Sequence, residues 1–139
     1  MTVEVEIEIV SFVEPEDYSR DEANSESFCI CKFMLLETNS QPTMIYGPIK
    51  HYGYHAELLN RYCNERKLAT SWNRMPESLE IYEQSVRLRG GGWLEIRPDQ
   101  KLVRIWGGST VYGKFSEALI CEAQTSDAFF PGFEFVAER

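Results

Sequence analysis

His55 is the residue of this sequence best placed to do chemistry. It stands at the start of a predicted helix, after Gly53 and Tyr54 and before the apolar pair Leu58 and Leu59. The first N–H groups of a helix have no intrahelical acceptor and, together with the helix dipole, favour a bound anion. The same dipole disfavours the imidazolium, so a neutral ring near pH 7 is available as a base or a nucleophile. The other interpretation is a histidine that only packs against or caps the helix start.

Lys32 is the second candidate because its neighbours are apolar. We predict a central strand over Phe28–Leu36, in which the side chains on the same face as Lys32 are Phe28, Ile30, Met34 and Leu36. A buried ammonium without a partner is unfavourable, so Lys32 must either reach solvent at a sheet edge or meet an anion. A bound phosphate would be such an anion.

The third candidate is the segment WGGSTVYG, residues 106–113. It combines a strand end, two glycines and the hydroxyls of Ser109 and Thr110 ahead of a second predicted helix. Backbone N–H and hydroxyl groups in such a turn suit an oxyanion. No Gly-Lys-Ser/Thr follows at the spacing of a Walker motif. The alternative is that Ser109 or Thr110 simply caps the helix.

A metal site is a further alternative, with His51 and His55 four residues apart and Cys29 and Cys31 as additional ligands. However, His51 precedes Gly53 and is expected outside the helix, and the two cysteines alternate onto the strand face opposite Lys32. The sequence also lacks the glutamate of an HExxH motif. We therefore expect no metal and no cofactor, and we expect Cys29 and Cys31 to be reduced and buried.

Hydrophobic periodicity predicts the elements that position these residues. Strands are expected where Val3, Val5, Ile7 and Ile9 alternate with glutamates, and over 28–36, 43–46, 79–82, 86–89, 93–97, 101–106 and 133–137. Helices are expected over 54–67 and after 110, and residues 68–78 are expected to be irregular. The fold class is α/β: one domain over residues 1–139, a sandwich with a mixed β-sheet of about five to six strands and two main helices packed on it.

The overall charge limits the classes of molecule that the protein is expected to bind. With 22 acidic against 14 basic residues, the net charge is −8. Such a chain repels a phosphate backbone, so we expect no nucleic-acid partner and a local site for any anionic substrate. No apolar run is long enough to cross a bilayer, and the first residues do not form a signal peptide. We expect a cytoplasmic monomer without a membrane partner.

Three short segments resemble the protein histidine phosphatase family, also called Janus/ocnus, which includes the small phosphohistidine phosphatase. The segments are Tyr54-His55-Ala56, Arg89-Gly90-Gly91-Gly92 and residues 108–113, and they occur in the family's order. The resemblance extends from about Phe28 to Val136, and joint order and spacing carry its specificity.

This resemblance implies a metal-independent phosphatase that acts on phosphohistidine, and in some members on phospholysine, in proteins. His55 would be the catalytic histidine, as nucleophile or general base. The phosphate would be held by Lys32, Ala56, Ser109, Thr110 and Val111, with Ala56 and Val111 contributing backbone N–H groups.

Two differences from the family lie at positions where it carries arginine. This chain has Tyr46 and Trp93 instead, and Arg87 or Arg89 are candidates to supply the missing charge. Tyr54 and Trp93 are expected to line the substrate cleft. The alternative function is a non-catalytic phosphate- or phosphopeptide-binding module that keeps the fold.

Overall fold

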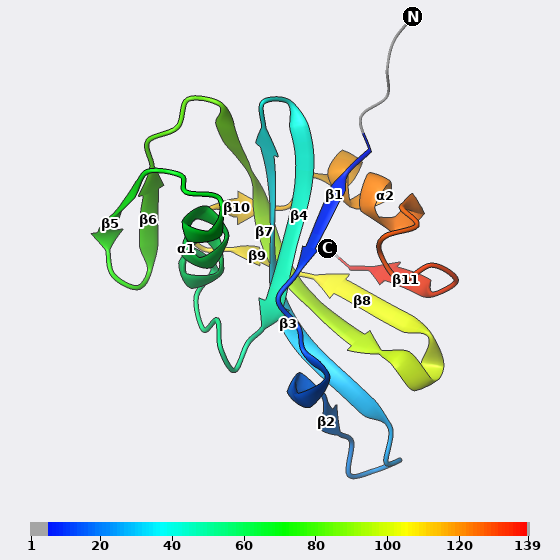
Figure 1. Cartoon of the computed structure of the whole chain (residues 1–139). Coiled ribbons are helices and arrows are strands. Elements are labelled where there is room, and N and C mark those ends of the chain that lie inside the picture. Colours follow the sequence, from blue (N-terminus) through cyan, green and yellow to red (C-terminus); the bar gives the residue numbers. More distant parts are fainter. Residues whose placement is uncertain (1–5, 139) are drawn as a thin grey trace, which may run out of the picture.

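The computed structural model describes residues 6–138 and contains two helices and eleven strands (Figure 1). The helices are α1 (His55–Glu65) and α2 (Glu117–Thr125), and two 3-10 turns cover Pro15–Asp17 and Pro98–Gln100. The strands are β1 (Glu8–Ser11), β2 (Ser19–Arg20), β3 (Ser27–Thr38), β4 (Gln41–Pro48), β5 (Thr70–Arg74), β6 (Ser78–Ile81), β7 (Val86–Arg97), β8 (Leu102–Trp106), β9 (Gly108–Ser109), β10 (Gly113–Lys114) and β11 (Glu134–Ala137).

Nine of these strands form one mixed sheet. Its main path is β1-β4-β3-β7-β10-β9, while β8 and β11 extend from β7, and β2 pairs with β3. The β1/β4, β7/β10 and β8/β11 pairs are parallel, and the long central pairs β3/β4 and β3/β7 are antiparallel. The mixed sheet is therefore confirmed, but the predicted five to six strands were too few. Strands of two to four residues, such as β2, β9 and β10, are too short to show a hydrophobic period.

The two helices pack on opposite faces of the sheet (Figure 1). The apolar side chains of α1, which include the pair Leu58 and Leu59, are fully or almost fully buried, and they pack against Met34, Leu36 and Ile45. The buried residues of α2 pack with the other face of β3, where Cys29 and Cys31 lie as expected. In the part of the chain that the structure describes, no helix has both the length and the apolar character needed to cross a membrane.

The hairpin between β3 and β4 fixes the register of the central strands. Asn39 and Ser40 both have positive φ angles, 51° and 65°, and they connect the last pair, Thr38 and Gln41. A two-residue turn with two positive φ angles matches the twist of the flanking strands. The turn between the strands predicted over 28–36 and 43–46 is therefore confined to Asn39 and Ser40.

The segment 68–78, predicted to be irregular, instead forms most of a second, two-stranded sheet. Strands β5 and β6 pair antiparallel and stand beside α1, outside the main sheet (Figure 1). Leu79 is buried in the cluster beneath α1, and Trp72 and Ile81 pack against it. Burial against α1 stabilises this hairpin, and polar residues at most other positions hide its period in the sequence.

The two separate strands expected over 86–89 and 93–97 are instead one strand, β7, which runs without a break through the three glycines. Met34 pairs with Gly91 and Leu36 pairs with Leu88, so one residue of β3 lies opposite two residues of β7. Strand β7 therefore contains a β-bulge, which a glycine run permits. Gly90 has a φ of +84°, and a Cβ there would lie 1.9 Å from a carbonyl oxygen of β10. Only glycine therefore fits where β10 joins the sheet.

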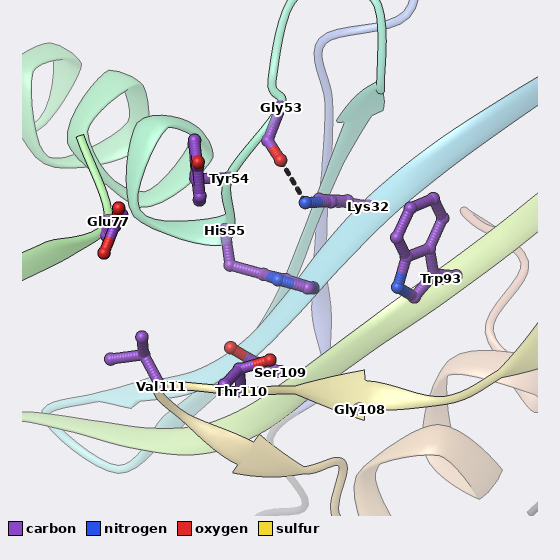
Figure 2. Close-up of a pocket in the computed structure, with 10 residues that line it drawn as sticks. All are labelled: Lys32, Gly53, Tyr54, His55, Glu77, Trp93, Gly108, Ser109, Thr110 and Val111. Carbon is purple, nitrogen blue, oxygen red and sulfur yellow. Dashed lines mark hydrogen bonds between the residues drawn. The ribbon is translucent and has the colours of Figure 1, made fainter.

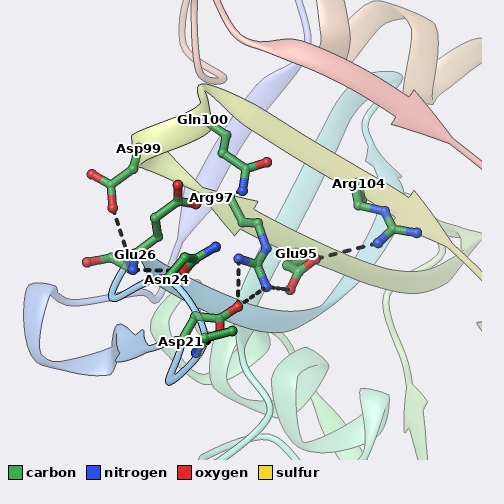
Figure 3. Close-up of polar contacts among 10 residues, drawn as sticks. Asp21, Asn24, Glu26, Glu95, Arg97, Asp99, Gln100 and Arg104 are labelled. Carbon is green, nitrogen blue, oxygen red and sulfur yellow. Dashed lines mark hydrogen bonds and ion pairs between the residues drawn. The ribbon is translucent and has the colours of Figure 1, made fainter.

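A network of charged side chains joins the ends of β2, β7 and β8 (Figure 3). Arg97 lies 3.1 Å from a carboxylate oxygen of Asp21 and 3.3 Å from one of Glu95, and Arg104 reaches Glu95 at 4.0 Å. The backbone N–H of Ser27 donates to Asp99. These contacts hold the loop before β3 against the far end of the β7–β8 hairpin, away from the candidate site.

The N-terminal strand is described only in part. Strand β1 pairs in parallel with β4, and Ile7 is buried beside it. The expected alternation at Val3 and Val5 lies outside the described residues. Within the described part, the predicted strand is confirmed at Ile9, whereas Ile7 lies just before β1.

Candidate active site

A cavity of about 280 Å³ lies where α1 begins, between β3, β7 and the β9–β10 turn. Its lining residues are Lys32, Gly53, Tyr54, His55, Glu77, Trp93, Gly108, Ser109, Thr110 and Val111. Figure 2 shows the His55 imidazole between Lys32 and Ser109, with Trp93 on one side and Glu77 and Val111 on the other. The structure thus brings together seven of the eight residues predicted for the site.

The His55 ring is held by a hydrogen bond that fixes its tautomer. Its Nε2 lies 2.9 Å from the carbonyl oxygen of Gly92. Because a carbonyl can only accept, Nε2 carries the proton and Nδ1 keeps its lone pair when the ring is neutral. The nitrogen with nucleophilic or basic character is therefore Nδ1.

Burial is the main reason that His55 stays neutral. The side chain is almost fully buried, which lowers its pKa below the ordinary 6.5, and the Lys32 ammonium lowers that pKa further against the opposing effect of the Gly92 carbonyl. The sequence predicted a neutral ring from the helix dipole. The structure gives the same protonation state with burial as the largest cause.

We expect an NMR titration of the folded protein to give His55 a pKa below 6.5. The sign for stability follows: as the pH falls below the ordinary value, the unfolded chain takes up a proton that folded His55 resists, so the free energy of unfolding decreases. The His55→Ala variant identifies the resonance by its loss. A pKa at or above 6.5 would contradict the placement of the ring.

The glycine run lets His55 reach β7. A Cβ at Gly91 would lie 2.6 Å from the carbonyl oxygen of Phe33, 2.7 Å from the sulfur of Met34 and 3.0 Å from Cδ2 of His55. A Cβ at Gly92 would lie 2.8 Å from a carbonyl oxygen of β8. The glycines thus admit the imidazole to the sheet surface, where Gly92 binds it.

Lys32 lies in the middle of the sheet, so the sheet-edge alternative is wrong. Strand β3 pairs with β4 on one side and β7 on the other. The Lys32 ammonium donates to the carbonyl oxygen of Gly53, and it lies 5.6 Å from the ring centre of Tyr54 and 5.0 Å from that of Trp93. Burial lowers its pKa from the usual lysine value. The ammonium has carbonyl and aromatic contacts, which leave it room for an anion.

Ser109 belongs to a strand turn rather than to a helix start. Its hydroxyl oxygen accepts the N–H of Tyr112 at 3.1 Å, so its own proton remains to be donated. The cap of α2 is Ser116, whose hydroxyl accepts the N–H of Leu119 at 3.4 Å. The alternative in which Ser109 or Thr110 caps the helix is therefore wrong, and Thr110 and Val111 form the tip of the β9–β10 turn.

Ala56 is the predicted site residue whose side chain lies elsewhere. That side chain is fully buried in the cluster beneath α1, and Ala56 does not line the cavity. Its contribution is confined to its N–H in the first turn of α1, where a helix leaves such groups without an intrahelical acceptor. Glu57 accepts the N–H of Tyr54 at 2.9 Å, which fixes the helix start.

The two positions expected to hold arginine differ in location. Tyr46 is buried on the α2 face, against Phe129 at a centroid distance of 5.7 Å, and does not reach the cavity. Trp93 lines the cavity, and Arg89 pairs with Glu37 instead of entering it. Among the described residues, Lys32 is the one lysine or arginine that lines the cavity.

The ligands of the alternative metal site are not brought together. His51 lies 3.1 Å from Asp17 while His55 contacts Gly92, and Cys29 and Cys31 face the other side of the sheet. Across residues 6–138, no three or more His, Cys, Asp or Glu side chains are grouped so that they could hold a metal ion.

Asp17 anchors the loop that leads into the site. Its carboxylate accepts the N–H of Glu14 at 2.7 Å and lies 3.1 Å from both Lys50 and His51, four residues before His55. The pKa of Asp17 lies below its ordinary value. The hydrogen bond from the Glu14 N–H makes the largest contribution, and Lys50 and His51 lower this pKa further.

We therefore expect Asp17→Asn to destabilise the protein at pH 7 but hardly at low pH. A lowered carboxylate pKa stabilises the fold above the ordinary value of 3.8, and this stabilisation is lost as the pH falls through the folded-state pKa. Urea unfolding of both proteins at pH 7 and near pH 3 measures it. An equal difference at both pH values would contradict the role of the charge.

Three contributors to the site were not predicted from sequence. Glu77 comes from the hairpin that was expected to be irregular, and the carbonyls of Gly53 and Gly92 position Lys32 and His55. Because every residue has a backbone carbonyl, residue type does not indicate which carbonyls contribute to a site. For Glu77, a correct prediction of the β5–β6 hairpin would have been the only signal.

A search of curated proteins gave no significant match. The family model of the Janus/Ocnus family matches residues 21–133, which include every residue of the cavity. Since this match covers most of the sequence, the chain belongs to the Janus/Ocnus family.

Proposed function

We propose that this protein is a metal-independent phosphatase that removes phosphate from phosphohistidine, or from phospholysine, in proteins. The observation that carries the proposal is that neutral His55, the Lys32 ammonium and the Ser109 hydroxyl meet in one small cavity. Phosphoryl transfer depends on positioning and on charge stabilisation, and these three groups supply both.

The phosphoryl oxygens would be held by four groups. Lys32 supplies the positive charge, Ser109 donates its hydroxyl proton, and the N–H groups of Ala56 and Val111 complete the cradle. Each is a donor, as a phosphoryl dianion requires. The small volume of the cavity fits a phosphoryl group and the end of the side chain that carries it.

Two routes are compatible with a free Nδ1 on His55. In the first, Nδ1 attacks phosphorus, the P–N bond of the substrate breaks, and the leaving nitrogen takes a proton from water; a second water then hydrolyses phospho-His55. In the second, Nδ1 takes a proton from a water that attacks phosphorus in line; the P–N bond of the substrate breaks, the leaving nitrogen takes a proton from water, and phosphate is released without a phospho-enzyme. Rapid quenching into alkali, which preserves phosphohistidine, followed by mass spectrometry of the His55 peptide distinguishes them.

The function is tested by phosphate release from a phosphohistidine peptide in the presence of a chelator. We expect multiple turnovers, with a phosphoserine peptide of the same sequence cleaved far more slowly, because the anionic serine alkoxide is a poorer leaving group than an imidazole that leaves neutral once it is protonated. Absence of turnover by wild-type protein would contradict the proposal.

One observation favours the alternative, a phosphopeptide-binding module. With Trp93 where the family carries arginine, Lys32 is the only cation lining the cavity among the described residues. Isothermal titration with the same peptide separates the two: binding without phosphate release supports the module, and release supports the enzyme.

A further inference from the structure

Glu77 places a negative charge at the mouth of the candidate site. We propose that it makes the site select phosphoryl groups on polypeptides with a lysine or arginine next to the phosphorylated residue. This proposal rests on the proposed function, and it adds the class of protein substrate that the site recognises.

The position of Glu77 is determined by the fold. It lies in the turn between β5 and β6 and lines the cavity, and Figure 2 shows it across the His55 imidazole from Trp93. The hairpin is attached to the β9–β10 turn because the Tyr112 hydroxyl accepts the N–H of Leu79 at 2.9 Å and donates to the Leu79 carbonyl at 3.2 Å. The carboxylate is therefore carried by an element fastened to the phosphate-binding turn itself.

The carboxylate of Glu77 remains available to a ligand. Among the described residues it is the one Asp or Glu that lines the cavity. Glu77 forms an ion pair with Arg74 at 3.5 Å. The Glu77 side chain is 41% exposed and the Arg74 side chain is 78% exposed. An exposed pair of this kind contributes little free energy, so a substrate cation can replace Arg74 at small cost.

Exposed apolar side chains around the cavity point to a polypeptide substrate. Of the four large apolar side chains that the described chain exposes, Tyr54 and Val111 line the cavity, and Met75 lies in the same turn as Glu77. An apolar rim around a polar pocket is typical of a protein interaction site. A small phosphate compound would leave this rim unused.

In the described part of the chain, the site contains one positive group, Lys32, and one negative group, Glu77. It therefore suits a substrate in which a phosphoryl group lies beside a cationic side chain. Lys32 and Ser109 would take the phosphoryl group, while Glu77 faces the neighbouring residue and attracts a cation or repels an anion. The net charge of −8 acts in the same direction over a longer range.

The test uses three phosphohistidine peptides that differ only in the residues flanking the phosphohistidine: lysine, alanine or glutamate. With the full-length wild-type protein we expect kcat/KM to be about fivefold higher for the lysine peptide than for the alanine peptide, and lower for the glutamate peptide. Glu77→Gln should remove most of this preference and Glu77→Lys should reverse it. The preference should also weaken with added salt.

Glu80→Lys is the matched control, because Glu80 is an exposed residue of the same hairpin outside the cavity. It makes the same charge change and should retain the wild-type order. Equal effects of Glu77→Lys and Glu80→Lys, or a wild type without preference, would overturn the proposal.

Failure of the proposed function is recognised separately, by the absence of phosphate release from the alanine peptide. The preference is then measured as Kd by fluorescence anisotropy, with the same three sequences carrying a non-hydrolysable phosphonate analogue of phosphohistidine. A fivefold tighter Kd for the lysine peptide that Glu77→Lys reverses supports the role of Glu77, and equal Kd values overturn it.

Discussion

Replacing His55 by alanine is expected to lower kcat/KM for a phosphohistidine peptide by about 10³-fold. The variant lacks the only imidazole in the cavity among the described residues, and with it the Nδ1 lone pair that either route requires. Lys32 and Ser109 remain, so we expect the variant still to bind the phosphopeptide. Initial rates of phosphate release and titration calorimetry measure the two effects.

His51→Ala is the matched control for this prediction. The sequence contains two histidines, and His51 contacts Asp17 outside the cavity. We expect His51→Ala to retain hydrolysis. Comparable loss of activity in both variants, or full activity in His55→Ala, would show that His55 does not carry out the chemistry.

Replacing Gly91 by alanine is expected to lower the free energy of unfolding by about 1–3 kcal/mol and to reduce hydrolysis at the same time. The new Cβ would meet the backbone oxygen of Phe33 at 2.6 Å, which cannot move without disturbing the centre of the sheet. It would also press on the His55 ring, which must then move away from Gly92. Urea unfolding measures the stability, and the NMR titration reports the His55 pKa, which should move toward 6.5 as the ring becomes exposed.

Gly53→Ala provides the comparison for stability. A Cβ at Gly53 would lie 3.5 Å from a carboxylate oxygen of Glu57, an ordinary contact. We expect this variant to unfold with a free energy within about 1 kcal/mol of the wild type. If Gly91→Ala were equally mild and left the His55 pKa unchanged, close approach of the imidazole to β7 would not explain the glycine.

These two predictions differ in how far the sequence alone supports them. The position of His55 before the apolar residues of α1 is local, so residue order is enough to single it out. The need for glycine at 91 depends on a contact between residues far apart in the chain, and the hydrogen bond from His55 to Gly92 spans 37 positions. From sequence alone, a glycine run within a strand is compatible with a bulge or with close approach to a substrate. The structure contains the bulge, and it brings the run against the histidine.

By itself, the sequence determined the long elements and the residues that could do chemistry. Strand β3, helix α1 and the β7–β8 hairpin are long enough for hydrophobic period and turn residues to identify them, and Lys32 stands out because its neighbours are apolar. The tertiary structure decided the nine-stranded sheet, the β5–β6 hairpin with Glu77, the free nitrogen of His55 and burial as the main cause of its lowered pKa. The physical reason is that periodicity records contacts within an element, whereas burial, tautomer and pairing of short strands arise only when distant segments pack together.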